Sequence, residues 1–343
     1  MNLNILQNYL MQIGISLSLS LVLVLIFTPW MIKLGFKLGI VDHPDERRIH
    51  KKITPRCGGL AVFIAYSSTI YLLCFVLEYS LMTPDVKQWA QSAIPVSIPI
   101  VIIGLIDDRW DLKPIYKLLG QILVGCIAWG QGLNLGVMLG YDIPPLVDIS
   151  VTIFLYVAAM NAYNLIDGMD GVASGLAAIT SLGLGALNLI NGNEGMAILC
   201  LALTGSCVGF LRYNFHPARI FLGDSGSMYI GFILISLTLV GQDRTTAAVM
   251  LIVPLLTMGV PLIDTGLAIW RRSVRKAIYP DLKGSVSGAD KDHLHHRLAR
   301  KGLTQKKVAL LLYIIQAVLF GIGLLWVFLQ NYRTAIFVIA FFA

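Results

Sequence analysis

Long apolar runs separated by short polar segments constrain the fold of this chain more than any other feature. The runs approach the roughly 20 residues that a helix needs to cross the hydrocarbon core of a bilayer. Of the 343 residues, 57% are hydrophobic and 13% are charged, whereas an ordinary soluble domain is about a quarter charged. Because a helix satisfies its own backbone hydrogen bonds in lipid, the pattern predicts an all-α fold, a polytopic integral-membrane helical bundle.

Ten stretches are predicted to cross the membrane: residues 12–32, 59–79, 92–106, 115–131, 144–160, 172–190, 196–211, 226–241, 246–270 and 308–329. A further apolar run at 334–343 is too short to span and is interpreted as an incomplete eleventh helix, so we expect about 10–11 transmembrane helices. The first stretch lacks a basic segment before it, which favours a retained helix over a signal peptide. We expect one integral-membrane domain, residues 1–343.

Lysine and arginine are distributed unequally between the two sides of this threading. Four loops on one side hold 23 of the 26 basic residues, namely 33–56, 107–117, 212–219 and 271–307. The other side holds Lys87, Arg244 and Arg333. Because basic loops remain in the cytosol, the amino terminus is predicted to lie outside. The same bias explains the net charge of +7 without a nucleic-acid partner.

The polar segments that carry acids or histidines all fall on the predicted cytosolic side. The loops expected to form an active face there are 33–58, 107–114, 161–171, 212–225 and 271–307. Acidic residues beside a membrane are costly and usually functional. The five cysteines have no paired spacing, so neither a disulfide framework nor a zinc site is expected.

Asp107 and Asp108 follow an apolar run directly. Neighbouring residues on a helix point about 100° apart, so the two carboxylates are expected to do different work. One would lie near a metal or a proton, and the other would orient a neighbour. A solvated helix end with Arg109 and Lys113 as partners is the alternative.

Four polar residues recur at every third position in the segment NAYNLIDGMDG, namely Asn161, Asn164, Asp167 and Asp170. On a helix they would form one polar stripe, because residues three apart are neighbours. Amides and carboxylates together can bind hydroxyls, amides and a hard cation. Capping of the next helix is an alternative that would explain Asp170 alone.

Asp224 lies between glycines in the segment FLGDSGS, at the predicted start of a helix. Free backbone N–H groups at such a start favour anions, and the carboxylate can hold a cation that bridges to phosphate. A simple helix cap is the alternative reading of this residue.

Two basic segments complete the predicted face. The segment DKDHLHHR carries His293, His295, His296 and Arg297 in a pattern that favours phosphate or sugar binding over zinc. A basic cluster near the second helix includes Lys51 and Arg56; it is expected to bind either anionic head groups or the phosphate of a lipid substrate.

Five motifs occur in order along the chain: HPDERRIHKKITPRCGG, LIDDRWDLKP, NAYNLIDGMDG, FLGDSGS and DKDHLHHRL. Together they resemble the polyprenyl-phosphate N-acetylhexosamine-1-phosphate transferases. The resemblance implies a bacterial inner-membrane enzyme that transfers GlcNAc-1-phosphate from UDP-GlcNAc to undecaprenyl phosphate and releases UMP. It also implies a requirement for Mg²⁺, with Mn²⁺ as an alternative, in the first membrane step of O-antigen, common-antigen or teichoic-acid synthesis.

The resemblance also implies roles for individual residues. The metal ligands would be Asp224, Asp107 and Asp108. The catalytic residues would include Asp107, Asp108, Asp167, His293, His295 and His296. Substrate contacts would come from Asn161, Asn164, Asp170, Lys113, Lys117, Arg297, Lys51 and Arg56. A single displacement and an aspartyl intermediate both stay open, as does a homodimer.

Two rival functions remain at this stage. The wording of ITPRCGG and HLHHR resembles the UDP-GlcNAc branch more than the phospho-MurNAc-pentapeptide transferase of peptidoglycan synthesis. A secondary transporter would place its acids near the bilayer midplane and show internal repeats, and neither feature is found in this sequence.

Overall fold

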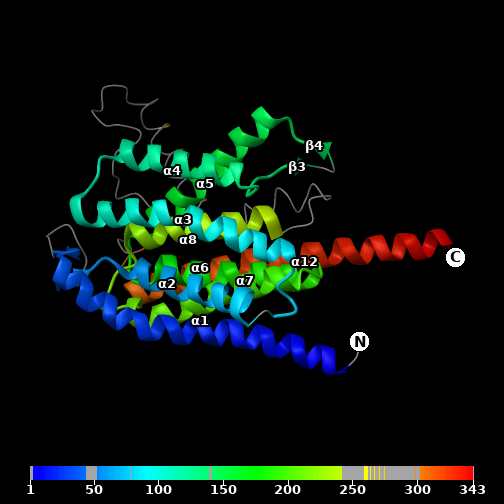
Figure 1. Ribbon diagram of the computed structural model, residues 1–343, viewed down its shortest axis with the longest axis horizontal. Helices are drawn as coiled ribbons and strands as arrows, with labels where there is room; N and C mark the ends of the chain where they lie inside the picture. The colour runs from blue at the N-terminus through cyan, green and yellow to red at the C-terminus, as the bar shows by residue number, and fades with distance from the viewer. Residues whose placement is uncertain are drawn as a thin grey trace.

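The computed structural model describes residues 3–43, 52–77, 79–138, 141–241, 259–261, 263, 266, 270, 274, 298 and 302–342. Within these ranges the protein is a bundle of long helices that run along one axis, and both termini lie at the same end (Figure 1). Eight of the helices are long and apolar enough to cross a membrane, and Pro114–Gly130 is a shorter apolar helix. The predicted helical membrane fold is confirmed.

The helices follow the predicted spans closely. They are α1 (Leu3–Leu38), α2 (Gly58–Tyr71) with the π-helix η1 (Leu72–Val76), α3 (Pro84–Trp110), α4 (Pro114–Gly130), α5 (Pro145–Ile166), α6 (Val172–Ile190), α7 (Glu194–Asn214), α8 (Gly223–Gly241) and α12 (Gln305–Phe342). Two short antiparallel pairs join loops, β1 (Val41–Asp42) with β2 (Thr54–Pro55) and β3 (Val137–Met138) with β4 (Tyr141–Asp142).

Two predictions about helix ends were wrong. The span predicted at 92–106 begins at Pro84, because Thr83 caps the helix and a proline suits its first turn. The expected break between 308–329 and 334–343 is absent, since α12 continues from Gln305 to Phe342. The intervening polar residues hold no proline or glycine that would end a helix. The predicted span at 246–270 lies mostly outside the described residues.

Helix α8 forms the centre of the bundle. It packs against α2, α3 and α5, and nearly all of its residues are buried. On the other side, α1 and α6 pack against α7, and α12 packs against α6. Lipid-facing apolar side chains cover the outer helices, as on α4, where Ile115, Leu119 and Leu123 are exposed.

The start of α8 is approached closely by both α2 and α3. Gly59 of α2 faces the backbone of Gly226, and Gly104 of α3 faces the backbone of Ser225, with no room for a Cβ atom at either glycine. Glycine therefore permits three helices to meet at one point. This junction holds the first turn of α8 in place.

Candidate active site

The loop before α8 is hydrogen-bonded to residues 55–59, which are far away in sequence. The N–H of Phe221 donates to the carbonyl of Pro55 over 2.8 Å, and the N–H groups of Gly58 and Gly59 donate to the carbonyls of Phe221 and Leu222 over 3.0 and 2.8 Å. Because of these bonds, the residues that follow β2 lie next to the residues that precede α8. Arg56, within this segment, is thereby placed beside the first turn of α8.

Asp108 caps the buried amino end of α8. Its Oδ1 accepts from the N–H of Asp224 over 2.9 Å, and its Oδ2 accepts from the N–H of Ser225 over 3.2 Å. Such N–H groups have no partner within their own helix and attract negative charge. The sequence predicted that this helix start would bind an anion. In the structure the protein supplies that anion itself.

Gly223 makes this contact sterically possible. Its φ of +75° lies in the left-handed region, and a Cβ atom at this position would lie 2.6 Å from Oδ2 of Asp108. Any other residue would therefore be strained and would also displace the carboxylate.

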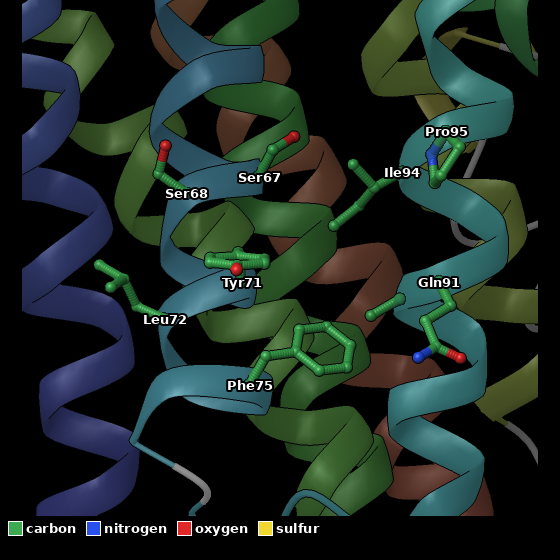
Figure 2. Close-up of a pocket in the computed structure, with 9 residues that line it drawn as sticks. Ser67, Ser68, Tyr71, Leu72, Phe75, Gln91, Ile94 and Pro95 are labelled. Carbon is green, nitrogen blue, oxygen red and sulfur yellow. The ribbon is translucent and has the colours of Figure 1, made fainter.

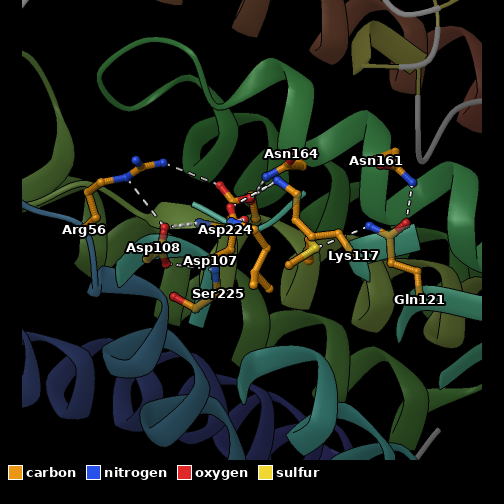
Figure 3. Close-up of polar contacts among 12 residues, drawn as sticks. Arg56, Asp107, Asp108, Lys117, Gln121, Asn161, Asn164, Asp224 and Ser225 are labelled. Carbon is orange, nitrogen blue, oxygen red and sulfur yellow. Dashed lines mark hydrogen bonds and ion pairs between the residues drawn. The ribbon is translucent and has the colours of Figure 1, made fainter. Parts of the chain in front are cut away.

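Lys117 of α4 pairs with both Asp107 and Asp224, the two acids of the cluster other than Asp108. Its Nζ lies 3.0 Å from Oδ2 of Asp107 and 2.9 Å from Oδ2 of Asp224 (Figure 3). Asp107 is further held by the N–H of Leu112, which donates to Oδ1 over 2.8 Å. Two buried carboxylates from α3 and α8 thus share one ammonium group.

Arg56 provides a second cation on the other side of the same acids. Its Nε lies 3.6 Å from Oδ1 of Asp108, and one of its terminal nitrogens lies 3.6 Å from Oδ1 of Asp224. Burial opposes its charge, but the surrounding carboxylates prevail and raise the pKa of Arg56. Two cations therefore compensate three clustered acids, which would otherwise repel one another.

Asp167 follows α5 and faces the same cluster. Burial raises the pKa of its carboxyl well above the usual range, the negative charge of Asp224 adds to the effect, and Arg56 opposes it. Asp107, Asp108, Asp167 and Asp224 come from three helix ends that are far apart in the chain. The structure therefore assembles the carboxylates that the sequence motifs had singled out.

The asparagines of α5 attach to different helices. The side-chain amide of Asn161 donates to Oε1 of Gln121 over 2.6 Å and also to the carbonyl of Val157 over 2.8 Å. The amide of Asn164 donates to Oγ of Ser227 on α8 over 3.1 Å. Asn164 is thus tied to the first turns of α8, and Asn161 is tied to α4. Among the described residues, the side-chain oxygen of Asn161 is left to accept a further bond.

Asp170 serves a neighbouring loop. Its Oδ2 lies 2.7 Å from Nδ1 of His216 and accepts from the N–H of Ala218 over 3.0 Å. The alternative reading of Asp170 as a helix cap was wrong, because α6 is capped at Gly171 without a side-chain bond. Asp170 fastens the turn after α5 to the loop after α7.

The remaining predicted residues divide into two groups. Lys113 is exposed just before α4 and joins no carboxylate within the described ranges. Lys51, His293, His295, His296 and Arg297 lie outside the described residues. The alternative partners considered for the paired acids were also wrong: Lys117 and Arg56 fill that role, whereas Arg109 lies over the ring of Trp110.

Sequence reasoning missed three residues that the structure ties to this region: Gln121, Ser227 and His216. Gln121 is buried in α4. Its amide nitrogen donates to the sulfur of Met228 over 3.3 Å, and its side-chain oxygen accepts a hydrogen bond from the amide of Asn161. A glutamine in the apolar run after Lys117 was the available signal, because an uncharged amide within a membrane span needs a partner.

The arrangement defines a class of protein: a multi-pass membrane protein with acids and cations gathered at one end of its helices. Residues 90–242 match the family described as glycosyl transferase family 4. The chain belongs to this family, the polyprenyl-phosphate N-acetylhexosamine-1-phosphate transferases that its motifs resemble, and it is therefore an enzyme.

Three relatives illustrate the similarity. A probable undecaprenyl-phosphate N-acetylglucosaminyl 1-phosphate transferase of Bacillus subtilis is 34% identical over 300 residues, covering 85% of this chain and 78% of the relative. A decaprenyl-phosphate N-acetylglucosaminephosphotransferase of Mycolicibacterium smegmatis is 35% identical, covering 84% and 75%. The undecaprenyl-phosphate alpha-N-acetylglucosaminyl 1-phosphate transferase of Escherichia coli K12 is 26% identical, covering 92% and 86%.

Proposed function

We propose that this protein transfers GlcNAc-1-phosphate from UDP-GlcNAc to undecaprenyl phosphate, giving undecaprenyl-diphosphate-GlcNAc and UMP. The names of the three relatives support the sugar and the prenyl phosphate. One structural observation carries the chemistry, namely that Asp107 and Asp224 share the ammonium of Lys117. A cluster of acids with balancing cations suits a reaction in which phosphates must be held and their charge neutralised.

The donor set of the cluster fits a magnesium ion. Mg²⁺ is usually held by one or two protein carboxylates together with water and substrate phosphates. Asp107 and Asp224 provide two such groups, while no three His, Cys, Asp or Glu side chains form a metal cage within the described part of the chain. When bound, Mg²⁺ would neutralise the negative charge that develops on the transferring phosphate oxygens. Mn²⁺ prefers the same ligands.

The remaining groups of the cluster position the reactants. Both oxygens of Asp108 are occupied by the N–H groups of α8, so Asp108 is a positioning residue and not a nucleophile. Lys117 and Arg56 are placed to bind phosphate oxygens, because both cations lie at the partly open edge of the cluster. Asn161 and Asn164 offer amide groups to a sugar or a nucleotide.

The proposed reaction is a direct displacement. An oxygen of the prenyl phosphate forms a bond to the β-phosphorus of UDP-GlcNAc, and the bond from that phosphorus to the bridging oxygen breaks. The electron pair leaves with UMP, so the reaction needs no redox partner. The prenyl phosphate is already ionised at neutral pH, and the cluster therefore needs to hold it more than to deprotonate it.

The location of the cluster argues against the rival functions. The acids lie at helix ends, in the last turn of α3, directly after α5 and in the first turn of α8, whereas a secondary transporter places its binding site near the bilayer midplane. A phospho-MurNAc-pentapeptide transferase would need the same chemistry, so the cluster alone does not separate it from a GlcNAc-1-phosphate transferase. The names of the relatives favour GlcNAc as the transferred sugar. The cluster is proposed to face the cytosol of a bacterial inner membrane, where UDP-sugars are made.

The test is a transfer assay with purified protein, undecaprenyl phosphate and a panel of labelled UDP-sugars. We expect labelled prenyl-diphosphate-GlcNAc and UMP in equal amounts, abolished by EDTA and restored by Mg²⁺ or Mn²⁺. UDP-MurNAc-pentapeptide should neither react nor compete. Absence of both products, together with solute flux in proteoliposomes, would instead establish the transporter.

A further inference from the structure

A groove lies between α2 and α3, far from the carboxylate cluster. Its volume is about 840 Å³ (Figure 2). One wall is formed by Ser67, Ser68, Tyr71, Leu72 and Phe75, and the other by Ala90, Gln91, Ile94 and Pro95. Pro95 and Asp107 are 12 residues apart on α3, which corresponds to roughly 18 Å along a helix. The groove therefore belongs to the opposite half of the bilayer and is separate from the proposed active site.

The wall formed by α2 has an unusual backbone. Residues Leu72–Val76 form a π-helix, η1, at the end of α2. Such turns are rare and occur frequently at functional sites. Tyr71 and Phe75 lie four residues apart on this wall, with ring centroids 5.7 Å apart, and Tyr71 is 59% exposed. A bulky aromatic pair thus borders a cavity that the neighbouring helix does not fill.

The position of the groove decides which ligand chemistry it can take. Both walls belong to helices that are apolar enough to cross the membrane. Water is a poor occupant of a space lined by Tyr71, Phe75 and Ile94, because the surrounding hydrocarbon offers it few partners. A flexible hydrocarbon chain fits such a space, whose volume lies within the range of small-molecule sites.

A cation lies one helical turn beyond the α3 wall of the groove. Lys87 precedes Gln91 by one helical turn on α3, so the two residues share one face of this helix. Within the described ranges no carboxylate forms an ion pair with Lys87. Only two other basic residues fall on this side of the predicted threading. An unpaired ammonium above an apolar groove is complementary to a lipid with an anionic phosphate.

We propose that the groove between α2 and α3 binds an anionic phospholipid from the leaflet opposite the carboxylate cluster. One acyl chain lies between Tyr71 and Ile94, and the phosphate interacts with Lys87. The exposed amide of Gln91, at the groove edge in Figure 2, lies between the two and can bond to the glycerol ester region. This site is independent of the proposed transferase activity.

Native mass spectrometry of the full chain in mild detergent tests the proposal, with dioleoyl-phosphatidylglycerol or dioleoyl-phosphatidylcholine added. We expect one tightly retained phosphatidylglycerol. Lys87→Gln should weaken its binding about fivefold, equivalent to about 1 kcal/mol, and leave phosphatidylcholine unchanged. The control Lys307→Gln removes an exposed charge on α12 and should have no effect.

A second pair of variants tests the groove itself. Ser68→Phe fills the groove and should abolish retention of the lipid, whereas Ser18→Phe adds the same bulk to an exposed position of α1 and should not. Equal binding of both phospholipids, or unchanged retention in Lys87→Gln, would overturn the proposal. Displacement of the lipid by undecaprenyl phosphate would also overturn it, because the groove would then hold the acceptor. None of these readouts requires turnover.

Discussion

The N–H of Asp224 donates a 2.9 Å hydrogen bond to Oδ1 of Asp108, although the two residues are 116 positions apart in the chain. This bond separates the tasks of two adjacent acids. Asp108 holds the first turn of α8, whereas Asp107 shares the ammonium of Lys117 with the side chain of Asp224. Neighbouring carboxylates with the same chemistry therefore have different partners, as their helical directions require.

Replacing the two acids separately should distinguish their roles. Asp108→Asn turns one acceptor into a donor that faces an N–H group, so we expect the free energy of unfolding to fall by about 1–2 kcal/mol. Asp107→Asn keeps an acceptor for Leu112 and should change stability little. Both variants should lose most of their turnover. Thermal unfolding in detergent and the transfer assay measure the two effects, and equal stability of the pair would contradict the assigned cap.

Removing the shared cation should impair the reaction more than the fold. In Lys117→Gln the carboxylates of Asp107 and Asp224 lose their common partner, and we expect kcat to fall by about 100-fold or more. Lys37→Gln, an exposed residue at the end of α1, is the matched control. The measurement is initial rate against Mg²⁺ concentration. Wild-type rates in Lys117→Gln would show that the shared contact is dispensable.

The hydrogen bond between Asp170 and His216 should contribute to stability and not to turnover. Asp170→Ala and His216→Ala each break the 2.7 Å contact, so each should lower the free energy of unfolding by about 1 kcal/mol. Asp170→Ala also removes the acceptor of the Ala218 N–H, so the double variant should be little worse than Asp170→Ala alone. Rates per folded molecule should stay within about twofold of the wild type. A large loss of kcat in Asp170→Ala, with an unchanged free energy of unfolding, would instead indicate that Asp170 contacts the substrate.

Asp167 should make the stability of the protein depend on pH. Burial raises the pKa of its carboxyl, so the folded state holds this proton more tightly than the unfolded state does. The resulting stabilisation is complete below the pKa of the unfolded chain and is lost as the pH rises through the folded pKa. Asp167→Asn, which keeps the neutral shape, should therefore melt at a higher temperature than wild type at pH 7.5 but not at pH 4.

The comparison is made in EDTA, so that no divalent ion alters the charge of the cluster. Asp85→Asn, at an exposed position in the first turn of α3, is the matched control for the loss of one carboxylate. A variant at position 167 that is less stable than wild type at pH 7.5 would contradict the prediction. Its transfer activity should nevertheless fall, since active-site groups are commonly retained at a cost in stability.

The membrane class and most helix positions follow from the sequence because they depend on local properties. The length of an apolar run decides whether a helix can span, and the bias of lysine and arginine orients the spans. Threading by these two rules places Asp107, Asp167 and Asp224 at one end of the chain's helices, and in the structure they do lie together. The start of α3 at Pro84 and the uninterrupted α12 differ from the prediction. Hydropathy does not report the cap at Thr83 or the absence of a helix-breaking residue within α12.

The choice of partners within the cluster depends on tertiary structure alone. Arg109 and Lys113 are the nearest cations to the paired acids in sequence, yet Arg56 and Lys117 pair with them, because packing of α2, α3 and α8 at small residues sets which helix ends meet. The same packing makes Asp108 the anion at the start of α8 and sends Asp170 to His216. Sequence thus determined which groups gather at one membrane face, through helix length and charge bias, whereas long-range contacts decided what each group touches.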